Sequence, residues 1–268
     1  MDIIEQLDAW RGKYAGWKSK QSGSLESLDG YHFVENVRAP FTPLHRSLSM
    51  LNLALISSAG AYIDGTDPFD TSTADGDHTF REIPAQIDPS DLRFSVRGYD
   101  PAFVQQDVNV QLPLNRLLEF ASNRVIGQLN SAFWSFCGFV PDAASLVEIM
   151  LPKLVDRLKH YEVQAALLIP ASRLCHQSVA LAARAIEQAG IPTMMLSVER
   201  EVIQGVHPPR AGFYQGQFGS VVGQPNWPEH QRRVLDEALR WIESASQPGN
   251  NKLAVEIESQ VEAARGER

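Results

Sequence analysis

The chain has 268 residues, of which 44% are hydrophobic, and carries a formal net charge of −8. This length allows one large domain or two small ones with a sizeable core. An acidic balance without a basic run argues against a nucleic-acid binder. No apolar stretch approaches the roughly 18 residues of a membrane span, so no membrane partner is expected. The acidic N-terminus does not resemble a signal peptide, and two cysteines are too few for a disulfide framework, so we expect a cytoplasmic protein.

The N-terminal third begins with a predicted amphipathic helix over residues 3–17, followed by a polar Gly/Ser-rich loop. We therefore expect a helical arm over residues 1–30. The first clear strand is predicted at 51–56. It ends in the small residues 57–60, which would let a ligand approach the backbone closely or simply form a tight turn.

Residues 64–84 form the longest polar stretch, with five aspartates between residues 64 and 77. A loop of this length is usually functional or disordered. Its spacing does not match a calcium-binding EF-hand loop. Asp77 and His78 could bind a metal together with His207, but they lack a helical or tight-loop ligand spacing, so we predict no metal site.

The middle of the chain has a second predicted strand at 92–96, with Arg97 at its end, and helices at 113–122 and 142–161. Asp107 and Asn109 lie two residues apart and would share one side of an extended segment. The aromatic segment 131–140 is predicted to be core or interface, with Cys137 as a core cysteine. Asp142 is a plausible N-cap of the helix that follows.

Residues 164–198 read as strand, loop, helix and strand. Short apolar runs at 164–169 and 193–198 suit buried strands, and apolar spacing predicts a helix over 176–189. Gly190 and Pro192 are well placed to end that helix. The unit predicts two parallel strands with a right-handed crossover. Since ligands of open α/β sheets bind outside the carboxyl ends of strands, the loop 171–176 is a candidate site.

Cys175 is the first candidate for chemistry because it lies where this helix begins. The positive end of a helix dipole favours a thiolate, and Arg173 and His176 could add to that effect. His176 could also relay a proton. The alternative is a cysteine that only fills space, since cysteine is among the most buried residue types.

The C-terminal part contains a Gly/Pro-rich segment expected over the top of the sheet, an amphipathic helix at 228–244 and a charged tail over 247–268. Alternation of strands and helices predicts an α/β fold, a three-layer, Rossmann-like sandwich around a mostly parallel sheet, over residues 31–246. Motifs of dinucleotide-binding, Walker, α/β-hydrolase, zincin and thioredoxin proteins are absent from the sequence, and we predict no cofactor.

Several segments together resemble the selenoprotein B family of the glycine, sarcosine, betaine and D-proline reductases, over about residues 40–243. They are PFTPL (40–44), SSAG (57–60), DPFD (67–70), GDHTFREIP (76–84), DVN (107–109), PLNRL (113–117), FCG (136–138), LCHQS (174–178), GIP (190–192) and PPR (208–210). No single motif is specific, and their order and number carry the resemblance.

The resemblance implies a B subunit with a cysteine or selenocysteine in the loop before the central helix. Its thiolate or selenolate attacks the α-carbon of an amino acid or N-methyl derivative. Reductive cleavage of the C–N bond follows, with a partner subunit whose pyruvoyl group activates the amine. The family's redox residue falls at Ser172, three residues before Cys175. Serine is a poor nucleophile at carbon without an adjacent base and cannot form a disulfide.

The α/β unit with a cysteine after a strand also resembles the aspartate/glutamate racemase group. Those enzymes need two opposed cysteines, and only Cys175 lies in a suitable loop. We therefore rank a racemase lower.

The leading hypothesis is an oxidoreductase-like enzyme that acts on a small amino acid or related carboxylate through Cys175, by reductive or lytic cleavage of a C–N or C–S bond. Arginine binds carboxylates in a bidentate manner, and polar groups can orient an amine. The candidate substrate-binding residues are Asp77, His78, Arg81, Arg97, Asp107, Asn109 and Arg210. The alternatives are a non-catalytic small-molecule-binding subunit, or a repurposed lyase or transferase of specialised metabolism that uses Cys175 or a metal. A partner subunit or a homo-oligomer fits each of these hypotheses.

Overall fold

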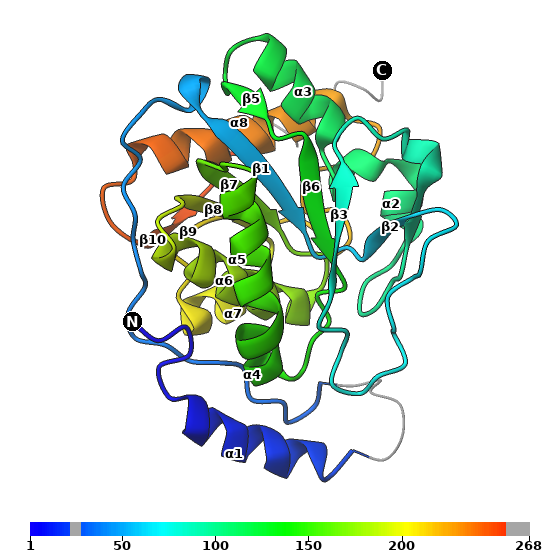
Figure 1. The fold of residues 1–268 in the computed structure, drawn as a ribbon, viewed down its shortest axis with the longest axis vertical. Coiled ribbons are helices and arrows are strands. Elements are labelled where there is room, and N and C mark those ends of the chain that lie inside the picture. Colours follow the sequence, from blue (N-terminus) through cyan, green and yellow to red (C-terminus); the bar gives the residue numbers. More distant parts are fainter. Residues whose placement is uncertain (22–27, 256–268) are drawn as a thin grey trace.

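The computed structural model describes residues 1–21 and 28–255, which form an α/β sandwich (Figure 1). The main sheet has eight strands in the order β10-β9-β8-β7-β1-β6-β3, with β5 paired to β1. Its strands are β1 (Asn52–Ser57), β3 (Phe80–Pro84), β5 (Gln128–Leu129), β6 (Ala132–Phe136), β7 (Ala165–Ile169), β8 (Thr193–Ser197), β9 (Arg210–Phe213) and β10 (Gly249–Lys252). All neighbouring strands are parallel except β3, which is antiparallel to β6. The predicted fold class is therefore confirmed.

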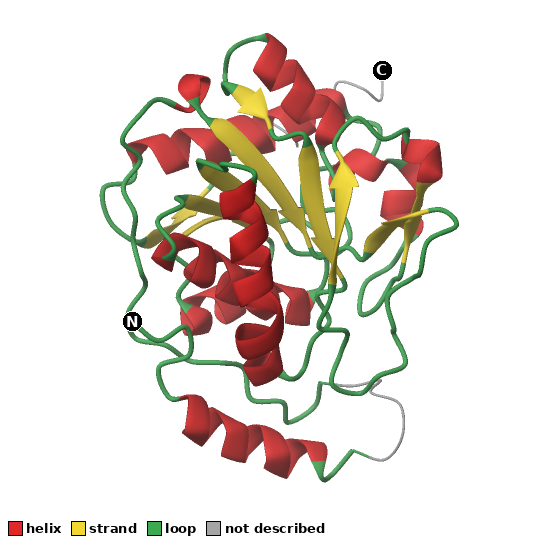
Figure 2. Cartoon of the chain, viewed as in Figure 1, coloured by secondary structure: helices red, strands yellow, loops and turns green. Residues whose placement is uncertain are grey.

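Helices cover both faces of this sheet (Figure 2). The α-helices are α1 (Leu7–Lys18), α2 (Ala102–Gln106), α3 (Leu114–Ser122), α4 (Ala143–Ser145), α5 (Leu151–His160), α6 (Arg173–Gln188), α7 (Arg200–Val206) and α8 (Pro228–Ser244). Side chains of α5, α6 and α7 pack against one face, and side chains of α3 and α8 pack against the other. β1 serves both cores, because Ala54 and Ile56 point to the first face while Leu53 and Leu55 point to the second. No helix among the described residues is long and apolar enough to cross a membrane.

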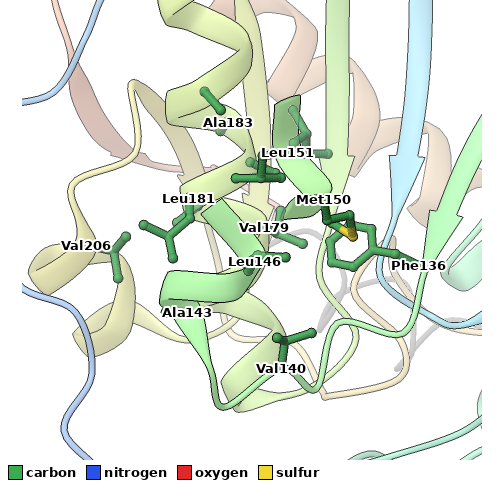
Figure 3. Packing of buried hydrophobic residues seen from close by; sticks show 14 of the residues in the cluster. Phe136, Val140, Ala143, Leu146, Met150, Leu151, Val179, Leu181, Ala183 and Val206 are labelled. Carbon is green, nitrogen blue, oxygen red and sulfur yellow. The ribbon is translucent and has the colours of Figure 1, made fainter. Parts of the chain in front are cut away.

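Helix α6 lies deep in the first core, where Val179, Leu181 and Ala183 pack among side chains from neighbouring elements (Figure 3). Every residue from 174 to 187 is buried. A helix that is largely buried all round belongs to the interior of a protein. The candidate loop at its N-terminus is therefore fixed by the core beneath it.

The helix predicted over 142–161 consists of three pieces, with a π-helical turn, η4 (Leu146–Met150), between α4 and α5. Pro152 follows this turn and has no N–H to donate to the carbonyl four residues earlier, which accounts for the break in the α-helical ladder. Asp142 is the N-cap, as predicted, and its carboxylate accepts from the Ser145 N–H at 3.1 Å.

The strand predicted at 92–96 lies outside the main sheet, which corrects our assignment. It is β4 (Leu92–Phe94), and it pairs antiparallel with β2 (Ala61–Ile63) in a separate two-stranded sheet. A strand this short, with an exposed Arg93, cannot bury two faces as a central strand does. The central position next to β1 belongs instead to β6, the fully buried aromatic segment that we had assigned only to core or interface.

The main sheet also extends beyond residue 246, because β10 pairs in parallel with β9. The first residues of the expected tail therefore belong to the sheet, whereas its residues 256–268 lie outside the described part of the chain. At the other end, α1 contributes Trp10, Tyr14 and Trp17 to the first core. The division into an arm, a central domain and a tail stays a prediction.

A fully buried ion pair joins α6 to β9. The Arg210 guanidinium donates to Glu187 at 2.6 Å and to the Thr42 carbonyl at 2.7 Å, and it stacks over the Phe41 ring. The other Glu187 oxygen accepts from the backbone and hydroxyl of Thr193, each at 2.7 Å. Both charged side chains have no exposed surface. Arg210 is thus engaged inside the fold rather than presented to a ligand.

We expect Glu187→Gln to lower the free energy of unfolding by roughly 3–5 kcal/mol, because it leaves the buried Arg210 charge uncompensated. Chemical denaturation would measure this loss. The matched control is Glu201→Gln, which removes a carboxylate that is 81% exposed and should cost no more than about 0.5 kcal/mol. Equal costs for the two variants would contradict a stabilising role for the buried pair.

Candidate active site at the carboxyl ends of three strands

Three neighbouring parallel strands, β6, β1 and β7, end side by side. The segment after β1 contains Ser58 and Ala59, the segment after β6 contains Cys137 and Gly138, and β7 leads through Ala171 into α6. The loop predicted as a candidate site therefore lies at the carboxyl edge of the sheet, where open α/β sheets bind ligands.

Ser58 ties these three strand ends together. Its N–H donates to the Ile169 carbonyl at 3.0 Å, and its own carbonyl accepts from the Gly138 N–H at 3.1 Å. Its hydroxyl accepts from the Ala171 N–H at 3.0 Å. One residue therefore fixes the loops after β6 and β7 relative to β1.

The Cys175 sulfur lies inside this junction. Ser172 is the N-cap of α6, and its hydroxyl accepts from the Cys175 N–H at 3.3 Å and donates to Cys175 Sγ at 3.0 Å. The sulfur lies 3.9 Å from the Ser58 carbonyl oxygen. Cys175 is only 1% exposed, and the rings of Phe94 and Tyr99, which we call the cover of Cys175, pack against the cluster of Ala59, Ala171 and Cys175.

His176 is buried, and backbone groups occupy both of its ring nitrogens. Nε2 lies 3.1 Å from the Val198 N–H and accepts from it, which leaves Nδ1 as the protonated nitrogen that donates to the Ser172 carbonyl at 2.7 Å. Burial lowers the pKa of His176 to about 4. The imidazole is therefore neutral near pH 7 and links the end of β8 to the start of α6, and its role as a proton relay stays a prediction.

The second cysteine is a neighbour of the same site. Cys137 forms an isolated β-bridge with Ala59, and its thiol lies 3.6 Å from the Ser95 carbonyl. Burial, and then the neighbouring Cys175, raises the pKa of Cys137 to about 12. Cys137 is thus a buried core thiol, as predicted, although it ends a strand beside Cys175.

Tyr99 belongs to the site and was not found from the sequence. Its hydroxyl donates to the Ala59 carbonyl at 2.7 Å, and its ring packs with Phe94 against Ala59, Ala171 and Cys175. Burial raises its pKa, and the two cysteines nearby add to this effect. A tyrosine in a loop carries no periodic or motif signal, so only the folded arrangement identifies it.

Arg97 lies two residues before Tyr99 and is partly buried. Its guanidinium donates to the Thr73 carbonyl at 2.7 Å and lies 4.7 Å from the centre of the Phe139 ring. Burial lowers its pKa against the opposing effects of Cys137 and Asp70. Among the described residues, Arg97 has no carboxylate partner at ion-pair distance, so its remaining N–H groups can receive one.

Gly98 lets the Arg97–Tyr99 backbone approach the cysteine loop. It has a φ of +80°, and a Cβ atom there would lie 2.4 Å from the Phe139 ring and 3.2 Å from the Ser172 hydroxyl. The left-handed backbone and the close contact both require glycine.

Three predicted substrate-binding residues instead build the long polar stretch. Asp77 accepts from the Asp70 and Thr79 N–H groups, each at 2.8 Å. Arg81 donates to the Asp67 and Pro68 carbonyls and lies over the Phe69 ring. His78 has a buried Nε2 without a hydrogen-bond partner in the described structure.

Asp107 and Asn109 brace a different region, at the turn η3 (Val108–Val110). One Asp107 oxygen accepts from Gln231 at 2.6 Å on α8, and the other accepts from the side chain of Asn109 at 2.9 Å. These two residues therefore join the loop before α3 to α8. Residues 1–21 and 28–255 contain no group of three or more His, Cys, Asp or Glu side chains placed to hold a metal ion.

Together, the fold and the site define an α/β protein with a buried thiol at the carboxyl edge of a parallel sheet. The model of the glycine/sarcosine/betaine reductase selenoprotein B family matches residues 31–171, more than half of the chain. The chain belongs to this family, as the sequence motifs suggested.

Two curated relatives show how the chain compares with whole subunits. It is 30% identical to the D-proline reductase subunit gamma of Acetoanaerobium sticklandii, over 75% of this chain and 82% of that subunit. It is 27% identical to the glycine reductase complex component B subunit gamma of Symbiobacterium thermophilum, over 59% of this chain but only 37% of that subunit. No solved structure matches the chain.

We expect Gly138→Ala to destabilise the protein by roughly 1–3 kcal/mol, because overpacking a close-packed site costs about this much. The new Cβ would lie 2.4 Å from Ser58 Cβ and 3.0 Å from Cys175 Sγ, and neither atom is the far end of a flexible side chain. Denaturation of the variant would measure the loss. Gly12→Ala in α1 is the matched control, since its Cβ would meet nothing within 4 Å. A Gly138→Ala variant as stable as this control would contradict the packing described for the three strand ends.

We expect acid to destabilise the protein through His176. Below about pH 6.5 the unfolded chain gains a proton on this imidazole that the folded chain does not accept until about pH 4. The contribution of neutral His176 to the free energy of unfolding is therefore complete above pH 6.5 and is lost as the pH falls towards 4. The total loss is at most about 3 kcal/mol. Unfolding measured against pH for the parent and for His176→Gln would test this, since the variant should lose that part of the slope. The control for loss of a histidine is His160→Gln at an exposed position; unchanged acid sensitivity in His176→Gln would contradict the assignment.

Proposed function

We propose that this protein is a B-type component of an amino-acid reductase and that Cys175 is its reacting group. The observation that carries the proposal is the position of the Cys175 sulfur at the carboxyl ends of three parallel strands. Membership of the selenoprotein B family and relatives named as reductase subunits support the same role. The chain covers only 37% of the glycine and sarcosine reductase subunits that it matches, so their complete activities are carried over here only as proposals.

The proposed chemistry begins with attack of the Cys175 thiolate on the substrate carbon that bears the amine. A sulfur–carbon bond forms as the C–N bond breaks, and the amine leaves with a proton. The Ser172 hydroxyl, which donates to the sulfur at 3.0 Å, would support negative charge there. Release of the carbon product by reduction then needs two electrons.

Ser172 constrains where those electrons come from. A serine in the position expected for the family's redox residue cannot form a disulfide or selenenyl sulfide with Cys175. In this proposal the reductant is therefore a pair of thiols on a partner subunit. One thiol attacks the Cys175 sulfur and forms a mixed disulfide as the carbon product leaves with a proton, and the second thiol reduces that disulfide and restores the Cys175 thiol. The chain then works as one component of an assembly. The names of the relatives as subunits of larger complexes support this reading.

Arg97 is the proposed binding group for the substrate carboxylate. Its guanidinium is partly buried, stacks on Phe139 and has no carboxylate partner among the described residues. Bidentate pairing with a carboxylate matches guanidinium geometry, and a low-dielectric setting strengthens it. The proposed substrate is therefore a small amino acid or a related carboxylate.

A non-catalytic binding subunit is the second candidate, and the burial of Cys175 favours it. A sulfur that is 1% exposed can be a structural group beneath a ligand pocket. Under this alternative, Cys175→Ala keeps ligand binding, measured as a ligand-induced rise in melting temperature. The lyase or transferase alternative needs no external reductant, and it predicts turnover without any partner.

We expect Cys175→Ser to abolish turnover in the assembled complex, and Arg97→Gln to weaken binding of a carboxylate substrate about tenfold, or roughly 1.4 kcal/mol. The assay should use glycine, proline and their N-methyl derivatives, with reduced partner subunits. Arg240→Gln is the matched control because Arg240 pairs with Asp236 at 2.8 Å and is 72% exposed on α8, away from the site. Full turnover by Cys175→Ser would contradict thiol catalysis. Equal losses of substrate affinity in the two arginine variants would contradict the role of Arg97 in binding the carboxylate.

A further inference from the structure

A pocket of about 350 Å³ lies between the two-stranded sheet and α2, next to the cover of Cys175. Phe94 and Val96 line it from the strand side, Val104 and Gln105 line it from α2, and Val108 lines it from the turn that follows. In Figure 1 this region is the part of the molecule around β2 and α2, beyond β3.

The pocket has a mostly apolar lining, and its single cationic side chain is already neutralised. Arg93 pairs with Asp64 at 2.6 Å and also donates to the Ser90 and Leu92 carbonyls. The walls are otherwise aliphatic and aromatic, with an amide from Gln105. Such a lining suits an uncharged, apolar group and disfavours an unpaired charge.

Phe94 connects this pocket to the sulfur. The same ring that lines the pocket packs, together with Tyr99, against Ala59, Ala171 and Cys175. The Tyr99 hydroxyl holds its ring in place through the bond to the Ala59 carbonyl. Phe94 therefore belongs both to the pocket wall and to the side chains packed around Cys175, with Tyr99 in the second group.

The opposite side of the same segment faces the charged part of the site. Ser95, which follows Phe94, directs its carbonyl towards the Cys137 thiol and its hydroxyl towards the Phe69 N–H. Arg97 continues on towards Thr73 and Phe139. The short segment 94–97 therefore contains both a residue of the apolar pocket, Phe94, and the proposed carboxylate-binding residue, Arg97.

We propose that the pocket beside Phe94 is the entry and holding site for the apolar part of a molecule that reacts at Cys175. The side chains of Phe94 and Tyr99 act as a gate between this pocket and Cys175, and rotation of the two rings opens the way to the sulfur. This inference rests on the proposed function in taking Cys175 as the reacting group. It adds a substrate class: a small molecule with a carboxylate at one end and an uncharged carbon chain or ring at the other.

The experiment measures alkylation of Cys175 by N-ethylmaleimide, a small uncharged reagent, in the full native chain. Mass spectrometry of the Cys175 peptide separates this reaction from any at Cys137. Phe94→Ala removes a gate ring and should speed the reaction about tenfold, since the rate tracks the population of the open state. Gln105→Trp adds a ring to the pocket lining and should slow alkylation of Cys175 about tenfold in the parent protein. In the Phe94→Ala background it should cancel the faster alkylation that Phe94→Ala causes.

The matched control is Gln106→Trp, because Gln106 is also exposed on α2 but does not line the pocket. Equal rates for the two tryptophan variants, in both backgrounds, would overturn the route. So would a sulfur that stays unreactive in Phe94→Ala until the protein unfolds. A failure of the proposed function would be seen in a different assay. In that case the Cys175→Ser variant would keep its turnover, regardless of how fast Cys175 is alkylated in the parent protein.

Discussion

The junction at Ser58 is the contact on which the rest of the site depends. Its backbone and hydroxyl bind the chain ends that follow β6 and β7, so three loops share one reference point. Gly138 permits this close approach, because a Cβ atom there would lie 2.4 Å from Ser58 Cβ. Because the ends of parallel strands point the same way, one small residue can hold a thiol, a hydroxyl and two backbone carbonyls within one compact volume.

The buried charges of α6 keep that junction rigid from the opposite end. The Arg184 guanidinium is fully buried and donates to the carbonyls of Ile3, Arg38 and His207 at 2.9, 2.6 and 2.8 Å. Glu187 pairs with Arg210 one turn later. Removing such charges from water is costly unless their hydrogen bonds are made, so each guanidinium fixes the chain segments that supply its acceptors. Helix α6 thus binds three parts of the chain: the N-terminal segment, the segment after α7, and strand β9. These contacts fix the position of its own N-terminus.

The sequence allowed the fold class, the strands β1, β7 and β8 and the candidate loop to be predicted, and the other strands were missed for physical reasons. The βαβ unit around Cys175 was predictable because apolar runs, Gly190 and Pro192 mark its elements locally. β6 was missed because a continuous aromatic run has no alternation that distinguishes a central strand from other core. β10, with the sequence GNNK, has little intrinsic strand preference and forms because β9 offers it an edge. Arg210 and Arg97 look alike in sequence, and only long-range partners separate an internal anchor from an available cation.

Ser172 stands where the resemblance places the family's redox residue, and a serine there changes what the proposed chemistry requires. The serine keeps the helix N-cap, since its hydroxyl accepts from the Cys175 N–H, so the fold loses nothing there. The serine affects the redox chemistry instead, because a loop with only one sulfur cannot form an internal disulfide and so cannot supply two electrons to a substrate. Cys137 does not replace the missing partner readily, as burial raises its pKa to about 12 and keeps it a thiol near neutral pH. Under the proposed function, Cys175 therefore needs both a path for its substrate and thiols from outside the chain for its turnover. In that proposal, the rings of Phe94 and Tyr99 that pack beside Cys175 have to admit both the substrate and the partner's thiols.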